Sequence, residues 1–147
     1  MEQFVIRDMR EEDIKLIAEI EKISFSTPWS EMSFFNELHK PYSTSRVAVL
    51  DDSIAGYICA NCIKGEGHIL NLAVHPDYRR HGIAKALIGN MIEELRTKGC
   101  RFIYLEVRAS NDTAKKIYGN FGFRVAAIRR GYYIAPLEDA VIMMLEI

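Results

Sequence analysis

The sequence has little cysteine and no sign of a cysteine-based framework. Its three cysteines, Cys59, Cys62 and Cys100, are odd in number and too few for a disulfide scaffold. This usage is typical of a reducing compartment, so we expect a cytoplasmic protein. Cys59 and Cys62 form a Cys-x-x-Cys pair, but residues three apart point to opposite faces of a strand and no second pair completes a metal site. We therefore expect buried cysteines and no bound metal.

Long hydrophobic runs and an excess of positive charge are also missing. The longest uninterrupted apolar run, Ala140 to Leu145, is far shorter than a membrane span, and the segment Met1 to Phe4 lacks the features of a signal peptide. Lys and Arg number 19 against 20 Asp and Glu, which gives a formal net charge of −1. Because proteins that bind nucleic acid usually carry a clear basic excess, we expect neither a membrane nor a nucleic acid as partner.

The composition that remains is ordinary for a globular protein. The chain has 147 residues, of which 49% are hydrophobic and 27% are charged. A chain of this length buries enough surface to form a real core and a cleft. Neither an internal repeat nor an interdomain linker is visible, so the sequence predicts a single domain over residues 1–147.

The hydrophobic pattern predicts a mixed α+β fold. Short connections join three β-rich runs in the first half, which favours an antiparallel meander. A long amphipathic helix then separates two strands that should be parallel, with a right-handed crossover. Asp8 followed by Glu11 resembles a capping box and predicts the start of the first helix. The expected strands are Phe4–Ile6, Thr44–Leu50, Ile54–Ile63, His68–His75, Arg101–Arg108, Phe123–Arg130 and Asp139–Ile147, and the later helices should start at Ser30, at Gly82 and at Asn111 or Asp112.

The most specific local motif is the turn that leads into the long helix. The segment Val74 to Ala84 is typical of a strand, a turn and a helix N-terminus, and small residues at Gly82 and Ala84 allow a ligand to approach the backbone. Free N–H groups and the helix dipole favour a phosphate or pyrophosphate there. The Walker and Gly-x-Gly-x-x-Gly patterns are absent from the sequence, which disfavours ATP and NAD. On these residues alone, a solvated basic turn is an equally good interpretation.

The pattern Arg79-x-x-Gly82-x-Ala84 after a strand resembles the signature of the GCN5-related N-acetyltransferases (GNAT), and the order of elements is similar over essentially the whole chain. The resemblance implies a three-layer α/β/α fold with a mostly antiparallel seven-stranded sheet, one splayed parallel pair and about four helices. It also implies acetyl-coenzyme A as co-substrate. The residues that it places on the coenzyme are Leu72, Ala73, Val74, Arg79, Arg80, His81, Gly82, Ile83, Ala84, Lys85 and Asn111.

Further sequence segments resemble those of one branch of this family, whose members acetylate the N-terminal alanine of a small-subunit ribosomal protein. They are Pro28-Trp29-Ser30, Leu105-Glu106-Val107-Arg108-Ala109-Ser110-Asn111, Tyr132-Tyr133 and Glu138-Asp139-Ala140. The resemblance implies that Glu106 is the general base and that Tyr118 protonates the departing thiolate. It also implies that the loops after the first helix and between the last two strands form a slot for the acceptor's N-terminal peptide, with Trp29, Tyr132 and Tyr133 as its walls.

Several simpler interpretations stay open at this point. The residues alone favour an ordinary strand carboxylate for Glu106, a core aromatic for Tyr118 and a helix cap for Asn111. Glu138 and Asp139 either attract a basic peptide or are merely solvated.

Alternative functions also stay open. The same fold could acetylate a lysine side chain, a polyamine or another small amine, or could bind an acyl-coenzyme A without catalysis. An α-amino group has a reference pKa of about 7.7–8.0, against about 10.4 for lysine, so a base of modest strength suffices for an N-terminal acceptor. We expect a monomer or a weak homodimer.

Overall fold

The computed structural model describes residues 3–147, and over these residues the chain forms a seven-stranded sheet with four α-helices. The strand order is β1-β2-β3-β4-β5-β7-β6, and β4 with β5 is its one parallel pair within the described residues. The strands are β1 (Phe4–Asp8), β2 (Ser43–Leu50), β3 (Ser53–Ile63), β4 (Glu66–Val74), β5 (Phe102–Arg108), β6 (Arg124–Ile134) and β7 (Leu137–Glu146). The helices are α1 (Ile14–Ser24), α2 (Glu31–Leu38), α3 (Ile83–Thr97) and α4 (Asp112–Asn120).

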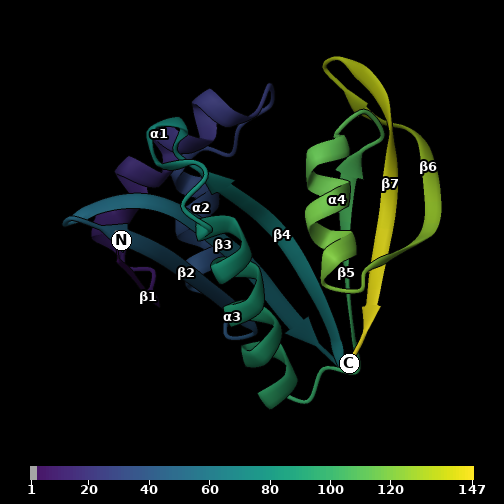
Figure 1. Cartoon of the computed structure of the whole chain (residues 1–147), viewed down its shortest axis with the longest axis horizontal. Helices are drawn as coiled ribbons and strands as arrows, with labels where there is room; N and C mark the ends of the chain where they lie inside the picture. The colour runs from purple at the N-terminus through teal and green to yellow at the C-terminus, as the bar shows by residue number, and fades with distance from the viewer. Residues whose placement is uncertain (1–2) are drawn as a thin grey trace.

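Helices cover both faces of the sheet and give three layers (Figure 1). On one face, Ile17 of α1 and Phe34 of α2 pack on Tyr57 in a buried hydrophobic cluster. On the other face, Leu87 of α3 and Tyr118 of α4 belong to a second buried cluster with the sheet. The predicted three-layer fold with a mixed, mostly antiparallel sheet is therefore confirmed.

Helix α3 forms because its apolar residues recur on one side. Leu87, Met91 and Leu95 follow one another at spacings of four and are fully buried against the sheet. The helix starts after Gly82, at a φ of 76°, and is followed by Gly99, at a φ of 86°. Glycine adopts this left-handed conformation without the steric cost that a Cβ would add, so the two glycines define the ends of the helix.

The parallel strands β4 and β5 pair only at their beginnings. The last paired residues are His68 and Tyr104, and the strands then diverge, as Figure 1 shows. The pairing of β4 with β3 is interrupted at the same level, because Cys59 pairs with Asn71 while Ala60 pairs with Ile69. One extra residue in β4 bends the strand away from β5. The second half of β4 is therefore not paired with β5, and its free edge faces the space between the two strands.

The start of the first helix differs from the sequence prediction. Asp8 lies at the end of β1, and a short 3₁₀ turn precedes α1. The local cap is Asp13, whose carboxylate accepts a hydrogen bond from the Arg10 backbone N–H at 2.8 Å and pairs with Arg7 at 2.8 Å. The predicted Asp8–Glu11 cap was wrong, because the pairing of β1 with β2 continues through Asp8 and outweighs the local signal.

The last hairpin is longer than predicted. Strand β6 continues to Ile134 and β7 begins at Leu137, so only two residues connect them. Tyr132 and Tyr133 therefore lie on β6, next to an irregularity in its pairing with β7, and the prediction that they belong to a loop was wrong. An edge strand can keep such an irregular stretch, which is difficult to recognise in a sequence.

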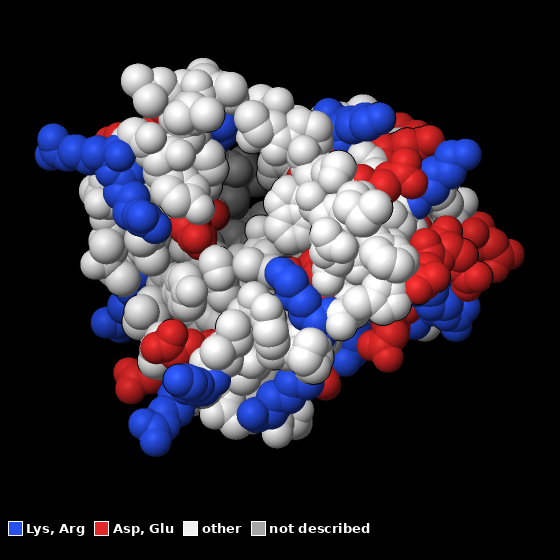
Figure 2. All heavy atoms as spheres, turned by 180° about the vertical axis from the view of Figure 1, so that it is seen from behind, with Lys and Arg blue, Asp and Glu red and all other residues white. Residues whose placement is uncertain are grey.

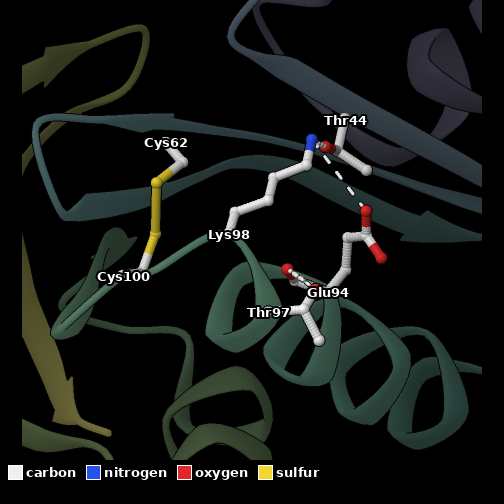
Figure 3. The surroundings of a disulfide bond; sticks show 6 residues. All are labelled: Thr44, Cys62, Glu94, Thr97, Lys98 and Cys100. Atoms are coloured by element: carbon white, nitrogen blue, oxygen red, sulfur yellow. Dashed lines mark hydrogen bonds and ion pairs between the residues drawn. A yellow bond between two sulfur atoms is a disulfide. The ribbon is translucent and has the colours of Figure 1, made fainter.

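Cys62 and Cys100, 38 residues apart, are joined by a disulfide (Figure 3). Cys62 lies at the end of β3 and Cys100 just before β5, close to a hydrogen bond that Lys98 donates to Thr44. The sequence predicted buried cysteines and not this bond, because the segments of Cys62 and Cys100 meet only in the folded chain. Cys59 is buried, as expected, and burial raises its pKa to about 12. No helix within residues 3–147 is both long enough and apolar enough to cross a membrane.

The packing of α3 on the sheet yields a stability prediction. Leu95 is fully buried against the start of β4, whereas Leu16 of α1 is 49% exposed. Leu95→Ala should lower the free energy of unfolding by about 2–5 kcal/mol, since it removes buried contacts and leaves a cavity. Leu16→Ala, the matched control, should change it by less than about 1 kcal/mol. Urea denaturation measures both, and similar losses would contradict this description of the core.

Candidate active site

A cleft of about 510 Å³ opens where β4 and β5 diverge. Its walls come from the segment between α1 and α2 and from β4, β5, α4 and β6. Figure 2, which shows the molecule from behind, shows a hollow bordered mostly by uncharged atoms. The predicted site residues that line the cleft are Trp29, Leu72, Glu106, Asn111, Tyr118, Tyr132 and Tyr133.

The predicted coenzyme residues of the turn lie at the start of α3, beyond the end of β4 and outside the residues that line the cleft. Arg80 and Gly82 both have positive φ angles, of 69° and 76°. A Cβ placed on Gly82 would meet no atom within 4 Å, so the backbone conformation, not crowding, requires glycine there. The space next to Gly82 is thus open, and the first N–H groups of α3 have no acceptor within the helix. This turn fits the pyrophosphate that the sequence predicted.

The edge of β4 continues the same site. Leu72, Ala73 and Val74 follow the bend and pair with β3 on one side but not with β5 on the other. An extended amide chain could therefore bind this edge as an added strand would. The pantetheine arm of coenzyme A has such amides, so the residues present fit the coenzyme along β4 as well as at the turn.

Glu106 projects from β5 into the cleft on the face opposite Leu105 and Val107, which are buried in the core. Its two carboxylate oxygens lie 2.7 Å and 3.2 Å from Nε2 of His68 on β4. A hydrogen bond with Glu106 also contributes to a raised pKa of Tyr132, after burial and the charge of Glu106. Glu106 is therefore a hydrogen-bonded carboxylate in a cleft and not a solvated surface group.

Tyr118 reaches the cleft from α4 and is only 6% exposed. Burial raises the pKa of its hydroxyl, so the group keeps its proton at neutral pH, as a proton donor must. Its ring packs edge-on against Phe123 at a centroid distance of 5.4 Å, which fixes the direction of the phenol. Tyr118 is thus a core aromatic and a cleft residue at the same time.

Asn111 caps α4, as the sequence predicted. Its side-chain oxygen accepts a hydrogen bond from the Ala114 backbone N–H at 3.1 Å. The same residue lines the cleft, and its contact with the coenzyme stays a prediction.

The three aromatic residues predicted for the peptide slot meet in this cleft from different elements. Trp29 follows α1 and packs on Phe34 at a centroid distance of 5.1 Å. Tyr132 and Tyr133 pack edge-on against each other at 5.0 Å. Burial and the charge of Glu106 raise the pKa of Tyr133 to about 12. Apolar walls with a few polar groups are typical of ligand-binding clefts.

One rim of the cleft is bridged. The Arg108 guanidinium donates to the backbone carbonyls of Ala135 at 3.1 Å and Pro136 at 2.9 Å, at the tip of the β6–β7 hairpin. Its centre also lies 4.3 Å from the centroid of the Tyr133 ring. Ser26, between α1 and α2, donates to the Ala135 carbonyl. The hairpin tip is thereby tied to the segment between α1 and α2.

Glu138 and Asp139 form further hydrogen bonds next to this rim. Glu138 pairs with Arg108 at 3.2 Å and accepts from the Ser110 backbone N–H at 2.6 Å, and the hydrogen bond from Ser110 lowers its pKa. Asp139 accepts from the Gly131 backbone N–H at 2.8 Å. Both carboxylates therefore hold the protein's own backbone, which neither of the two sequence interpretations anticipated.

The cleft also contains polar residues that were not predicted from the sequence, among them Glu21, His68 and Asn71. Glu21 is 2% exposed and accepts hydrogen bonds from the Tyr57 hydroxyl, from Asn71 at 2.8 Å and from the Trp29 backbone N–H at 3.0 Å. The signal was present in the sequence, because Glu21 falls on the apolar side of α1 and Asn71 interrupts an apolar strand. A carboxylate on a buried stripe needs polar partners, which indicates a site.

A smaller hollow of about 330 Å³ lies beside β2 and the end of α3. Its charged groups pair with one another, since Arg46 bonds Asp8 at 2.8 Å and Glu94 at 3.3 Å. No group of three or more His, Cys, Asp or Glu residues in the described part of the chain is placed to hold a metal ion. The larger cleft is therefore the candidate active site.

Comparison with known proteins agrees with this geometry. A model of the acetyltransferase (GNAT) family matches residues 13–123. The ribosomal protein bS18-alanine N-acetyltransferase of Salmonella typhimurium is 37% identical over 137 residues, covering 92% of each chain.

The fold is also similar to that of solved acetyltransferase structures. The crystal structure of the ribosomal-protein-S18-alanine N-acetyltransferase from Escherichia coli has a TM-score of 0.92 and 33% identity, over 99% of this chain and 94% of that chain. A chain in the crystal structure of the NatC complex bound to Gag peptide and CoA has a TM-score of 0.88 and 26% identity, over 100% and 99% of the two chains.

The hydrogen bonds of Glu21 yield a prediction about the cleft wall. Glu21→Ala leaves the Tyr57 hydroxyl and the Asn71 amide without their buried acceptor, which should cost about 1–3 kcal/mol of unfolding free energy. It should also release the Trp29 segment, giving faster amide hydrogen exchange there. Glu19→Ala, on the exposed side of the same helix, is the matched control. Unchanged exchange around Trp29 in Glu21→Ala would contradict the assigned role.

Proposed function

The chain belongs to the acetyltransferase (GNAT) family, and from this premise we propose that it acetylates the N-terminal alanine of a small-subunit ribosomal protein, with acetyl-coenzyme A as donor. The relatives named as bS18-alanine N-acetyltransferases support this acceptor, because they match nearly the full length of both chains. The observation that carries the proposal is that Glu106 and Tyr118 enter one cleft from β5 and α4, beside the open edge of β4. An acceptor on the ribosome implies a cytoplasmic enzyme.

The coenzyme supplies an acetyl group activated as a thioester. In this proposal the backbone of Arg79–Lys85 binds its pyrophosphate, the edge of Leu72–Val74 binds its pantetheine arm, and Asn111 contacts it from α4. Open space at Gly82 and the missing β5 partner of β4 support these assignments. Arg79, Arg80 and Lys85 add positive charge where the phosphates would lie, and His81 belongs to the same turn.

Proton transfers at the acceptor nitrogen and at the departing sulfur accompany acetyl transfer. Glu106 removes a proton from the acceptor's α-ammonium group, directly or through water, and leaves the neutral amine as nucleophile. The N–C bond forms as the C–S bond breaks, and Tyr118 donates a proton to the departing sulfur. The nitrogen loses its second proton to solvent as it becomes the amide, and the Tyr118 phenolate takes one back from solvent, so the products are the N-acetyl peptide, the thiol and one proton. A backbone N–H near Val74 stabilises the negative charge on the carbonyl oxygen. Cys59 is buried with its pKa raised to about 12, so it offers no thiolate for a covalent route.

The acceptor peptide occupies the part of the cleft walled by Trp29, Tyr132 and Tyr133. An α-amino group loses its proton far more readily than a lysine side chain, with reference pKa values of about 7.7–8.0 and about 10.4. A carboxylate base therefore suits the N-terminal acceptor better than the lysine acceptor of the alternative function.

A peptide assay tests the acceptor. Thiol release from acetyl-coenzyme A should be rapid with a basic peptide that starts with alanine and contains an internal lysine. The same peptide with a blocked α-amine should release thiol at least about a hundredfold more slowly, because only the lysine remains. Equal rates would reject the N-terminal acceptor and favour the alternative function, acetylation of a lysine side chain.

Substitution of the two proposed catalytic residues tests the mechanism. Glu106→Gln and Tyr118→Phe should each lower kcat by about a hundredfold or more, because each removes a proton-transfer group. The Kd for acetyl-coenzyme A, measured by calorimetry, should change little, since neither side chain holds the pyrophosphate or the pantetheine amides in this proposal. Glu146→Gln, an exposed change on β7, should leave kcat unaltered. A wild-type protein that binds the coenzyme but turns over no amine would instead be a sensor.

A further inference from the structure

The tip of the β6–β7 hairpin is held at the cleft without hydrophobic packing of its own residues. Ile134 and Leu137, on either side of the tip, are 80% and 75% exposed. Strand β6 lies at the edge of the sheet, and its pairing with β7 is interrupted between Arg129 and Tyr133. A hairpin with few buried apolar contacts keeps one position only if polar contacts with other elements hold it. The position of the tip, and of Tyr133 next to it, therefore depends on such contacts.

Arg108 of β5 makes most of these contacts. Its guanidinium donates to the carbonyls of Pro136 at 2.9 Å and Ala135 at 3.1 Å, and it pairs with Glu138 of β7 at 3.2 Å. The same group lies over the Tyr133 ring, 4.3 Å from its centroid. The planar guanidinium has five N–H donors and can bond several acceptors at once. Arg108 thus joins β5 to the hairpin tip, to β7 and to one aromatic wall of the cleft.

The segment after α1 completes this arrangement. Ser26 accepts a hydrogen bond from Arg108 at 3.3 Å and donates one to the Ala135 carbonyl. Further along the segment, the Trp29 backbone N–H donates to the buried carboxylate of Glu21 at 3.0 Å. Neither aromatic wall of the proposed peptide slot can therefore retreat without breaking hydrogen bonds.

We propose that Arg108 is a specificity-determining residue, which fixes the width of the peptide slot and thereby excludes acceptors with a large first side chain, such as leucine. The inference rests on the proposed function, because it concerns the acceptor of that same site. It adds the residue that makes the site choose a small first side chain. Arg108 acts through Tyr133 and the hairpin tip, so it is a positioning residue and not a catalytic one.

The geometry of β5 relates this wall to the proposed base. Glu106 and Arg108 are two residues apart on β5, and both line the cleft. Residues two apart on a strand share a face and lie about 6.5 Å from each other. The acceptor's α-nitrogen must come within hydrogen-bond reach of Glu106, directly or through one water. Because the first side chain starts one carbon from that nitrogen, it is held close to the wall that Arg108 fixes.

A fixed wall is what allows the slot to select by size. The cleft encloses about 510 Å³, and in the proposed function it also receives the thioester end of the coenzyme, so little volume remains for the first side chain. A larger side chain is rejected by a steric clash, and a clash is costly only where the wall cannot move. A wall that was free to shift would accept leucine with a much smaller loss. The contacts of Arg108 therefore turn a difference in side-chain size into a difference in rate.

The chain contains a matched control for the test. Arg129 of β6 lies over the ring of the other slot tyrosine, Tyr132, at 5.1 Å from its centroid, but Arg129 is exposed. In the described part of the chain, the side chains that donate to the two tip carbonyls are those of Arg108 and Ser26. Arg108→Lys keeps the positive charge and loses the planar group that bonds several acceptors. Arg129→Lys makes the same change at the control position.

The readout is the ratio of kcat/KM for two peptides that differ only in their first residue, alanine or leucine, measured as thiol release from acetyl-coenzyme A. The wild type should favour alanine by about a hundredfold or more. Arg108→Lys should lower this ratio by about tenfold or more, because the leucine peptide then meets a wall that yields. Arg129→Lys should keep the wild-type ratio.

The ratio separates a role in specificity from a merely structural one. Partial unfolding, or damage to the coenzyme site, lowers the rates with both peptides alike and leaves their ratio unchanged. Thermal melts and the Kd for acetyl-coenzyme A, measured by calorimetry, should stay close to the wild-type values in Arg108→Lys. A wild-type ratio in Arg108→Lys would overturn the proposal, whatever the size of the loss in absolute rate.

Ser26→Ala provides a second variant, which decides the question even if Arg108→Lys does not fold. The position is exposed, and the change removes one of the bonds to the Ala135 carbonyl from the opposite side of the rim. The ratio should fall in the same direction by a smaller factor, about 2- to 10-fold, as expected for one hydrogen bond. An unchanged ratio in Ser26→Ala would contradict the fixed wall.

Failure of the proposed function has a different signature. If the acceptor is an internal lysine, the first residue of the peptide does not lie at this wall, and the wild type itself should show a ratio near one. That result would reject the N-terminal acceptor together with the inference. If the wild type favours alanine and Arg108→Lys favours it equally, the acceptor stands and only the role of Arg108 is rejected.

Discussion

The short parallel pairing between β4 and β5 is the constraint on which the rest of the structure depends. The two strands hydrogen-bond only as far as His68 and Tyr104, because one additional residue in β4 bends it away. Beyond that point each strand needs something else to satisfy its backbone and its side chains. The cleft, the open edge of β4 and the side chains that enter from β5 all follow from this one irregularity.

The cleft also contains polar groups that are held at some cost to stability. Glu21 is buried, and its carboxylate is tolerated only because Tyr57, Asn71 and the backbone of Trp29 donate to it. These bonds join α1, the bent strand and the segment before α2. The same residue thus fixes two walls of the site relative to each other, which an apolar side chain in its place would not do.

The fold was largely predictable from the sequence, because hydrophobic periodicity and short connections are local signals. The long helix from Ile83 to Thr97 matched its pattern to within a residue at each end. Features that depend on pairing between distant segments were not predictable, such as the extension of β1 through Asp8 and the disulfide between Cys62 and Cys100. His68 was missed for the same reason, since only the parallel register with β5 brings it to Glu106.

The bridge between the hairpin tip and the segment before α2 has a mechanical consequence. Ser26 and Arg108 both bind the Ala135 carbonyl, so the wall of the cleft is continuous at that side. A displacement of the hairpin tip would therefore also displace β5 at Arg108 and the segment that follows α1, so these three segments move as one wall.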